Sequence, residues 1–163
     1  MTFRREPKPK GIQRVRFLLY PLLCSVGLVF LLSLTPVQAL RVGGKGVLWK
    51  VSAGDTFTLR YTHSMYGVEV RENFRVGEEN FTLYRVDSSE AALEYFGLEH
   101  SGPDNVRRTL TAFSIPTGSV GNHELILKDR RIQLHALSGA EERIPVTLVK
   151  TSLLKYLMHT LRR

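Results

Sequence analysis

The stretch at residues 57–76, FTLRYTHSMYGVEVRENFRV, decides the fold because apolar and polar residues alternate along both of its halves. Successive side chains of a strand point to opposite faces, so the apolar residues of each half fall on one side. The first half groups Phe57, Leu59, Tyr61 and His63, and the second groups Val68, Val70, Glu72, Phe74 and Val76. The pattern predicts two antiparallel strands, with His63 and Glu72 on faces that are otherwise apolar.

Glu72 is the unusual residue on this face, because a buried carboxylate is costly unless it is paired or protonated. A four-residue loop at 64–67 would place Glu72 opposite Leu59. At about 3.3 Å per residue, this register separates His63 and Glu72 by roughly 13 Å along the strands, so we expect no direct contact between them. Glu72 would instead accept a hydrogen bond from Tyr61 across a diagonal, or from a distant segment. It then either locks the fold or recognises a ligand or partner.

Strand-like segments recur along most of the chain after residue 46, separated by turns rich in Gly, Asp and Asn. We expect strands at 47–51, 55–63, 68–76, 81–86, 109–115, 124–127, 130–136 and 143–149. Ser89 is placed to cap a short helix that Gly97 ends. Apolar residues then recur at helical spacing in the last segment. The sequence predicts an all-β antiparallel sandwich or barrel at 40–150, with a short internal helix, followed by a C-terminal amphipathic helix at 151–163.

The N-terminal segment has the organisation of an export signal. Basic residues crowd the first 16 positions, an uncharged apolar run follows at 17–34, and Val37 and Ala39 place small residues before a cleavage point. Residues 1–39 are therefore predicted to be either a cleaved signal peptide or an uncleaved anchor in the inner membrane, since an apolar helix of this length spans about 27 Å. Both versions place the remaining residues in the periplasm.

Most of the formal net charge of +8 lies in this segment. Residues 1–39 hold six of the 23 basic residues and one of the 15 acidic ones, so the rest of the chain has a net charge of +3. A domain this mildly basic gives no case for nucleic-acid binding. The one cysteine of the chain, Cys24, lies in the apolar run, so the exported domain must be stabilised by its core rather than by disulfides.

Two kinds of chemistry can be weighed against the pattern. Ser64 follows His63, but neighbours in a strand point to opposite faces, and no Gly-x-Ser-x-Gly motif surrounds Ser64. The histidines and glutamates of the domain show no tight metal-ligand spacing, although His63, Glu72 and the loop at 97–105 could assemble a site. We therefore expect no catalytic residue, no metal and no cofactor, with a hydrolase using Ser64 and His63 as the least favoured alternative.

The run Tyr61-Thr62-His63-Ser64, followed by Val70, Glu72, Phe74 and Val76, resembles the signature of domain-of-unknown-function family 1850. Members of that family look like small exported bacterial proteins with one N-terminal apolar segment. They are frequently associated with tripartite ATP-independent periplasmic (TRAP) transporters of the fused-permease type. The resemblance implies an accessory role in solute uptake.

Tyr61, His63, Ser64 and Glu72 are therefore predicted to form a binding or structural signature. The leading hypothesis is a non-enzymatic, exported or membrane-tethered accessory protein whose partner is a TRAP-type permease. The alternative is a periplasmic domain that binds a small ligand or a metal independently of any transporter.

Overall fold

Two antiparallel sheets form the larger of two units in this computed structural model, which describes residues 11–44, 46–98, 104–116, 122–137 and 142–162, with side chains from residue 20 onward. The larger unit, here called the β unit, is Val37–Thr151, and the smaller consists of Met1–Pro36 and Ser152–Arg163. The prediction of an antiparallel, mostly β domain is confirmed.

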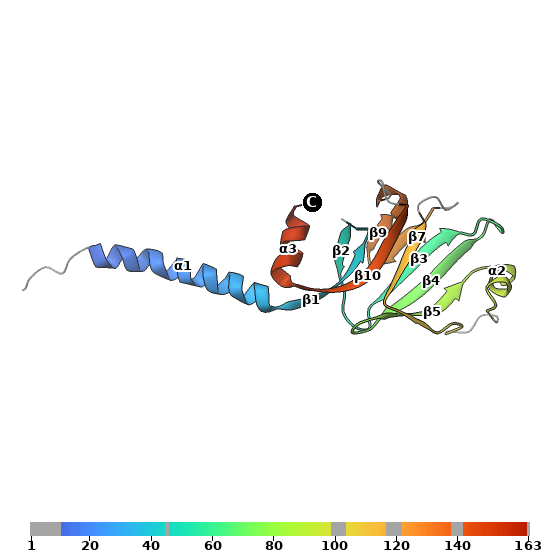
Figure 1. Cartoon of the computed structure of the whole chain (residues 1–163), viewed down its shortest axis with the longest axis horizontal. Coiled ribbons are helices and arrows are strands. Elements are labelled where there is room, and N and C mark those ends of the chain that lie inside the picture. Colours follow the sequence, from blue (N-terminus) through green and yellow to red (C-terminus); the bar gives the residue numbers. More distant parts are fainter. Residues whose placement is uncertain (1–10, 45, 99–103, 117–121, 138–141, 163) are drawn as a thin grey trace, which may run out of the picture. The chain divides into compact units, whose positions relative to one another are not determined.

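The two sheets have different sizes (Figure 1). The four-stranded sheet has the order β2-β1-β10-β7, from β1 (Pro36–Val42), β2 (Val47–Lys50), β7 (Ala112–Pro116) and β10 (Arg143–Ser152). The six-stranded sheet has the order β6-β5-β4-β3-β8-β9, from β3 (Thr56–Thr62), β4 (Glu69–Val76), β5 (Phe81–Asp87), β6 (Arg108–Leu110), β8 (Glu124–Leu127) and β9 (Arg130–Gln133). A short helix, α2 (Glu90–Tyr95), follows β5, and a 3₁₀ turn, η1 (Leu134–Leu137), follows β9.

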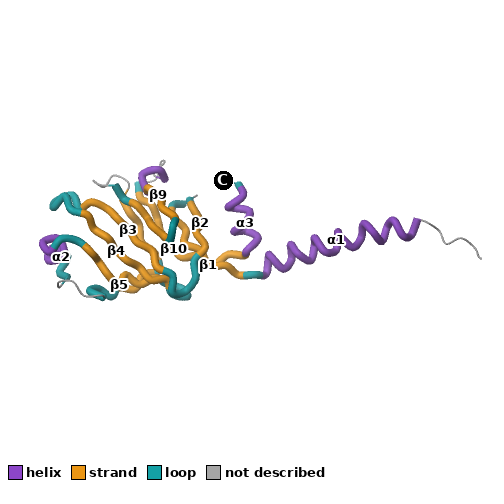
Figure 2. Tube along the Cα trace, turned by 180° about the vertical axis from the view of Figure 1, so that it is seen from behind, coloured by secondary structure: helices purple, strands orange, loops and turns teal. Residues whose placement is uncertain are grey.

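One hydrophobic core lies between the sheets, which face each other as layers in Figure 2. Both sheets contribute fully buried side chains, among them Leu40, Val42, Ile144 and Val146 from one and Phe57, Phe74, Phe81 and Leu125 from the other. The rings of Phe57 and Phe74 stack with their centroids 4.8 Å apart. Burial of each such side chain stabilises the fold by about 1.5–3 kcal/mol, so this layer of apolar residues is what joins the sheets into a sandwich.

Three elements differ from the sequence prediction. The strand expected at 109–115 is two strands, because the chain passes at Thr111 from β6, which pairs with β5, to β7, which pairs with β10. The strand expected at 130–136 ends at Gln133, and η1 begins at Leu134, whose N–H donates to His123 O. The sequence does not predict strand β1, because the pattern of its residues indicates an export signal followed by a glycine-rich lead-in.

The smaller unit contains α1 (Gly11–Leu34) and α3 (Leu153–Leu161). Ser152 caps α3 by accepting from Lys155 N–H, and Leu153 N–H donates to Thr35 O at 2.8 Å. None of the α3 side chains is buried. Over the part of the chain that the structure describes, no helix combines the length and the apolar character needed to cross a membrane.

Candidate functional site

The register of β3 and β4 is the one that the sequence predicts. Two backbone hydrogen bonds close the turn at 64–67. His63 N–H donates to Val68 O and Gly67 N–H donates to His63 O, each at 2.8 Å. Gly67 has a φ of +62°, a conformation that favours glycine. Glu72 consequently pairs with Leu59, and its side chain lies on the core face of the sheet.

Tyr61 satisfies the Glu72 carboxylate. The Tyr61 hydroxyl donates to Glu72 Oε1 at 2.9 Å, across the diagonal of the strand pair. Burial raises the pKa of Glu72, while the bond from Tyr61 acts in the opposite direction. Burial and the nearby Glu72 charge raise the pKa of Tyr61, so Tyr61 keeps its proton and remains the donor. The diagonal hydrogen bond, one of the two alternatives expected from the sequence, is confirmed.

This pair lies where two apolar clusters meet. The main core lies between the sheets, and a second cluster of Val70, Val86 and Leu93 lies between β4, β5 and α2. Tyr61 packs against both clusters, and its ring stacks on that of His123, with the centroids 5.0 Å apart. Because its carboxylate accepts a hydrogen bond from Tyr61 of β3, Glu72 of β4 contributes to joining the two strands at this boundary.

The opposite face of the same strands carries a network of charges. Glu124, only 5% exposed, places Oε2 2.6 Å from Arg60 Nη2 and accepts at Oε1 from Gln133. Glu69 lies within ion-pair distance of Arg60 and Arg71. The arginines of β3 and the adjoining part of β4 are therefore neutralised by carboxylates.

His63 lies at the end of β3 in a cluster of aromatic rings. Its ring centroid is 5.3 Å from that of Tyr66, 5.5 Å from Tyr95 and 5.4 Å from Phe96. Within the described part of the chain, His63 Nδ1 is buried and has no hydrogen-bond partner. Helix α2 supplies Tyr95 and is followed by Phe96, and its N-terminus is fixed by Ser89, which accepts from Ala92 N–H as predicted.

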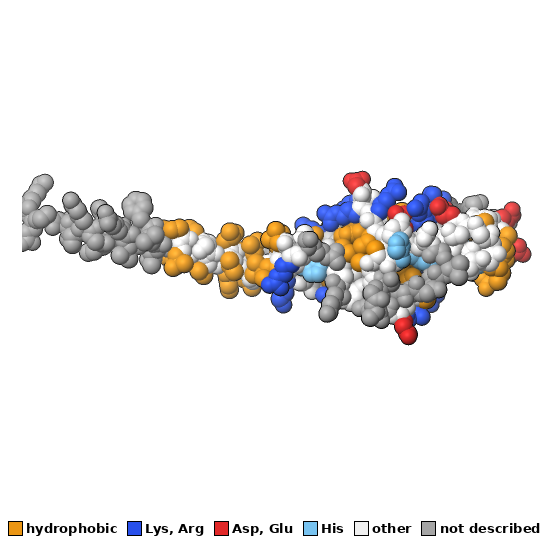
Figure 3. All heavy atoms as spheres, turned by 90° about the horizontal axis from the view of Figure 1, so that it is seen from above, with side chains coloured by type: hydrophobic (Ala, Val, Ile, Leu, Met, Phe, Trp, Pro, Cys, Tyr) orange, Lys and Arg blue, Asp and Glu red, His pale blue; other side chains and the backbone are white. Residues whose placement is uncertain are grey.

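Around His63 the neighbouring side chains are exposed. Met65 is 66% exposed, Tyr66 40%, Tyr95 56% and Phe96 37%. We call these four residues the aromatic patch. In Figure 3 apolar side chains gather at the end of the β unit that carries α2 and the β3–β4 turn. Apolar residues gathered on a surface in this way mark contact sites for other molecules.

The geometry at Ser64 gives the hydrolase hypothesis little support. Ser64 is exposed in the turn after β3, and among the described residues it makes no hydrogen bond to His63. Glu72, the acidic residue of the predicted signature, is bonded to Tyr61 rather than to His63. The four signature residues thus divide into an internal pair, Tyr61 and Glu72, and a strand end made of half-buried His63 and exposed Ser64.

The metal alternative gains no geometric support from the residues that the structure describes, since no three side chains of His, Cys, Asp or Glu converge there. Glu72 is occupied by Tyr61, and residues 99–103 of the loop that completed the predicted site lie outside the described residues.

Sequence reasoning missed two surface features. The aromatic patch joins the turn at 64–67 to a helix that begins only at Glu90, although two apolar residues inside a four-residue turn, Met65 and Tyr66, were a usable signal. A cleft of about 520 Å³ beside β4 and β5, lined by Arg75, Tyr84 and Arg107 among others, left no pattern in the sequence because it forms across strands.

Comparison with known protein families, with curated proteins and with solved structures finds no match for this chain.

Proposed function

We propose that the protein is a non-enzymatic, membrane-tethered accessory protein of a TRAP-type uptake system, which acts by binding the membrane permease. The resemblance at residues 61–76 supports the class of partner. The observation that most directly supports a recognition role is the aromatic patch beside His63. A single domain gains nothing from leaving four large apolar side chains in water, whereas buried aromatic residues contribute most of the energy of protein interfaces.

The division of the signature supports recognition rather than catalysis. Tyr61 and Glu72 satisfy each other and fix β3 against β4. His63 and the turn that follows it then hold Tyr66 next to Tyr95, and Met65 of the same turn is exposed. The internal pair positions the strand end, and the strand end presents the contact surface.

The position of β1 supports a tether that is kept rather than cleaved. The expected cleavage point follows Ala39, but Val37 and Ala39 are buried within β1. Gln38 donates to the carbonyl oxygens of Gly77 and Glu78 at 2.7 and 3.0 Å. Cleavage after Ala39 would remove these contacts from the β unit. Along α1, apolar side chains such as Leu22 and Phe30 are exposed, which suits a segment surrounded by lipid.

Co-purification tests the partner. The full chain, tagged at its C-terminus, is produced together with a TRAP-type permease of the same genome and purified in detergent. We expect the permease to accompany the wild type and the control Arg131→Ser, which changes an exposed residue of β9. The double variant Tyr95→Ser/Phe96→Ser should lose it. Met65→Ser, at the most exposed position of the patch, repeats the test if the double variant does not fold.

Two results would contradict the proposal: purification of the chain alone from membranes that contain the permease, or full retention of the permease by both patch variants. The tether is tested separately by sequencing the N-terminus of the membrane-bound chain. A mature protein beginning at Leu40 would show that the segment is cleaved.

A further inference from the structure

The cleft beside β4 and β5 holds two arginines that differ from their neighbours. Arg75 and Arg107 line it, and within the described residues neither forms an ion pair. By contrast, Arg71 lies 2.6 Å from Glu69 and Arg85 lies 2.6 Å from Asp87. The cleft therefore holds two guanidinium groups that form no ion pair with the carboxylates of the described residues.

A β-bulge shapes the floor of the cleft. Asn73 pairs with Arg85 and Phe74 pairs with Leu83, which leaves Tyr84 as the extra residue of β5. A bulge turns its side chain out of the regular alternation. The Tyr84 ring lies under Arg75, whose guanidinium carbon is 4.6 Å from the ring centroid. Stacking on an aromatic ring fixes the plane of a guanidinium and leaves its N–H edge free to bind a carboxylate.

The other wall of the cleft is held in place by Asn105. Its side chain accepts from Val86 N–H at 2.9 Å and donates to Val86 O at 2.8 Å. These bonds hold the segment 104–107 along the edge of β5, where Val106 N–H also faces Tyr84 O. The cleft is therefore built between fixed backbone segments.

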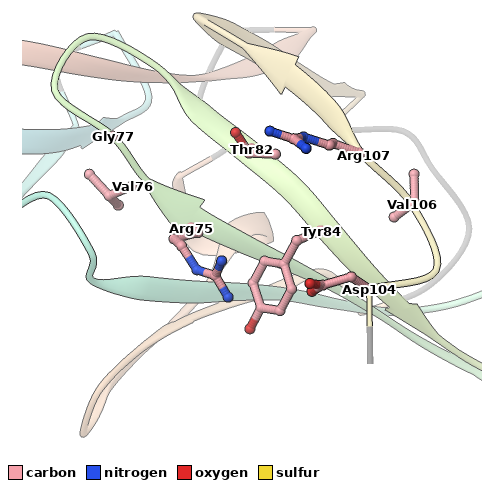
Figure 4. A pocket seen from close by; sticks show the side chains of 8 residues that line it. All are labelled: Arg75, Val76, Gly77, Thr82, Tyr84, Asp104, Val106 and Arg107. Carbon is pink, nitrogen blue, oxygen red and sulfur yellow. The ribbon is translucent and has the colours of Figure 1, made fainter. Parts of the chain in front are cut away.

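The lining specifies the chemistry of a ligand. Figure 4 shows the Tyr84 ring between Arg75 and Asp104, with Arg107 extending towards Thr82. Two guanidinium groups suit carboxylates, the Tyr84 ring and Val106 offer apolar walls, and the Asp104 carboxylate accepts from a hydroxyl or ammonium group. The volume of about 520 Å³ is typical of a small-molecule site.

We propose that this cleft binds a small organic carboxylate that carries hydroxyl or amino groups. The site lies on other residues than the aromatic patch, so it does not depend on the proposed permease contact. Inorganic phosphate is a poorer ligand because it leaves the apolar walls uncovered and its charge faces Asp104.

Calorimetric titration of the full chain in a non-ionic detergent tests the site with L-tartrate, succinate and inorganic phosphate as probes. Tartrate and succinate have the same two carboxylates and differ in their hydroxyls. We expect tartrate to bind with a dissociation constant of about 1 mM or tighter, and succinate several-fold more weakly. Arg75→Gln and Arg107→Gln should each weaken tartrate binding about tenfold or more, and Asp104→Asn should reduce the preference for tartrate over succinate.

Arg131→Gln, an exposed arginine of β9 at the other edge of the same sheet, is the matched control and should bind as the wild type does. All of the changed side chains are exposed, so folding should be kept, and the fluorescence of Trp49 checks it. Three results would overturn the proposal. These are no saturable binding of either carboxylate, equal binding by the Arg75 and Arg107 variants and the wild type, or phosphate binding as tight as that of tartrate.

Discussion

Tyr61→Phe removes the hydroxyl that donates to Glu72 and leaves the packing of the ring unchanged. In the described part of the chain, the Glu72 carboxylate is half-buried and accepts from Tyr61 at 2.9 Å. A hydrogen bond to a charged acceptor contributes about 1.5–3 kcal/mol, and protonation of Glu72 would recover part of the loss. We expect the free energy of unfolding to fall by about 1–3 kcal/mol, with a fall in Tm of roughly 3–6 °C for each kcal/mol at this domain size.

Urea unfolding of the full chain in detergent measures this loss through the fluorescence of Trp49. Trp49 is the only tryptophan of the sequence and is 5% exposed, so its emission reports the unfolding of the core. Tyr66→Phe is the matched control, since it removes the hydroxyl of an exposed tyrosine. It should change the free energy of unfolding by less than about 0.5 kcal/mol.

A double-mutant cycle with Glu72→Ala separates the bond from other effects of the two changes. The single changes at Tyr61 and Glu72 should be less than additive, with a coupling energy of about 1–2 kcal/mol. Two results would refute the assignment of Glu72 as a residue satisfied by Tyr61. These are a midpoint urea concentration for Tyr61→Phe equal to that of the wild type, or strict additivity in the cycle.

Three further predictions concern the same region. Because burial raises the folded-state pKa of Glu72 above its ordinary value of 4.5, the folded protein binds the Glu72 proton more tightly than the unfolded chain does. The stabilisation is complete below the ordinary value and is lost as the pH rises through the folded-state pKa, so Glu72→Gln should flatten the dependence of unfolding free energy on pH in that window. Arg60→Met should lower the free energy of unfolding by about 3 kcal/mol, because it leaves the buried Glu124 carboxylate without its cation. Glu124→Gln should lower it by only about 1 kcal/mol, because the Arg60 side chain is one-third exposed to water. Gly67→Ala should lower the free energy of unfolding by about 1 kcal/mol because of the positive φ alone, since the added methyl group meets no atom within 4 Å. Urea unfolding measures the effect of each of these substitutions.

Local pattern was enough to predict the central strand pair. Alternation placed Glu72 on the core face, and the length of the turn at 64–67 set it opposite Leu59. The order of the residues alone therefore predicted the hydrogen bond from Tyr61 as one of two possibilities. The cap at Ser89 was also predictable, because a capping side chain bonds only three residues along the chain.

The missed features depend on contacts between distant segments. The residues of β1 have the composition of an export signal, and only their pairing in the sheet assigns them to the β unit. No local signal marks Thr111 as the point where the chain changes sheets, or Tyr84 as the bulged residue that faces the cleft. The aromatic patch likewise forms only when α2 is folded against the end of β3.

Photo-crosslinking from position 66 tests the central claim most directly, namely that the strand end after His63 is a contact surface for a membrane permease. A photoreactive phenylalanine analogue replaces Tyr66 in the full chain, in cells that contain the permease, and replaces Arg131 in a control. The proposed function predicts a covalent adduct with the permease from position 66 and none from position 131. Equal adducts from both positions, or no permease adduct from position 66, would contradict it.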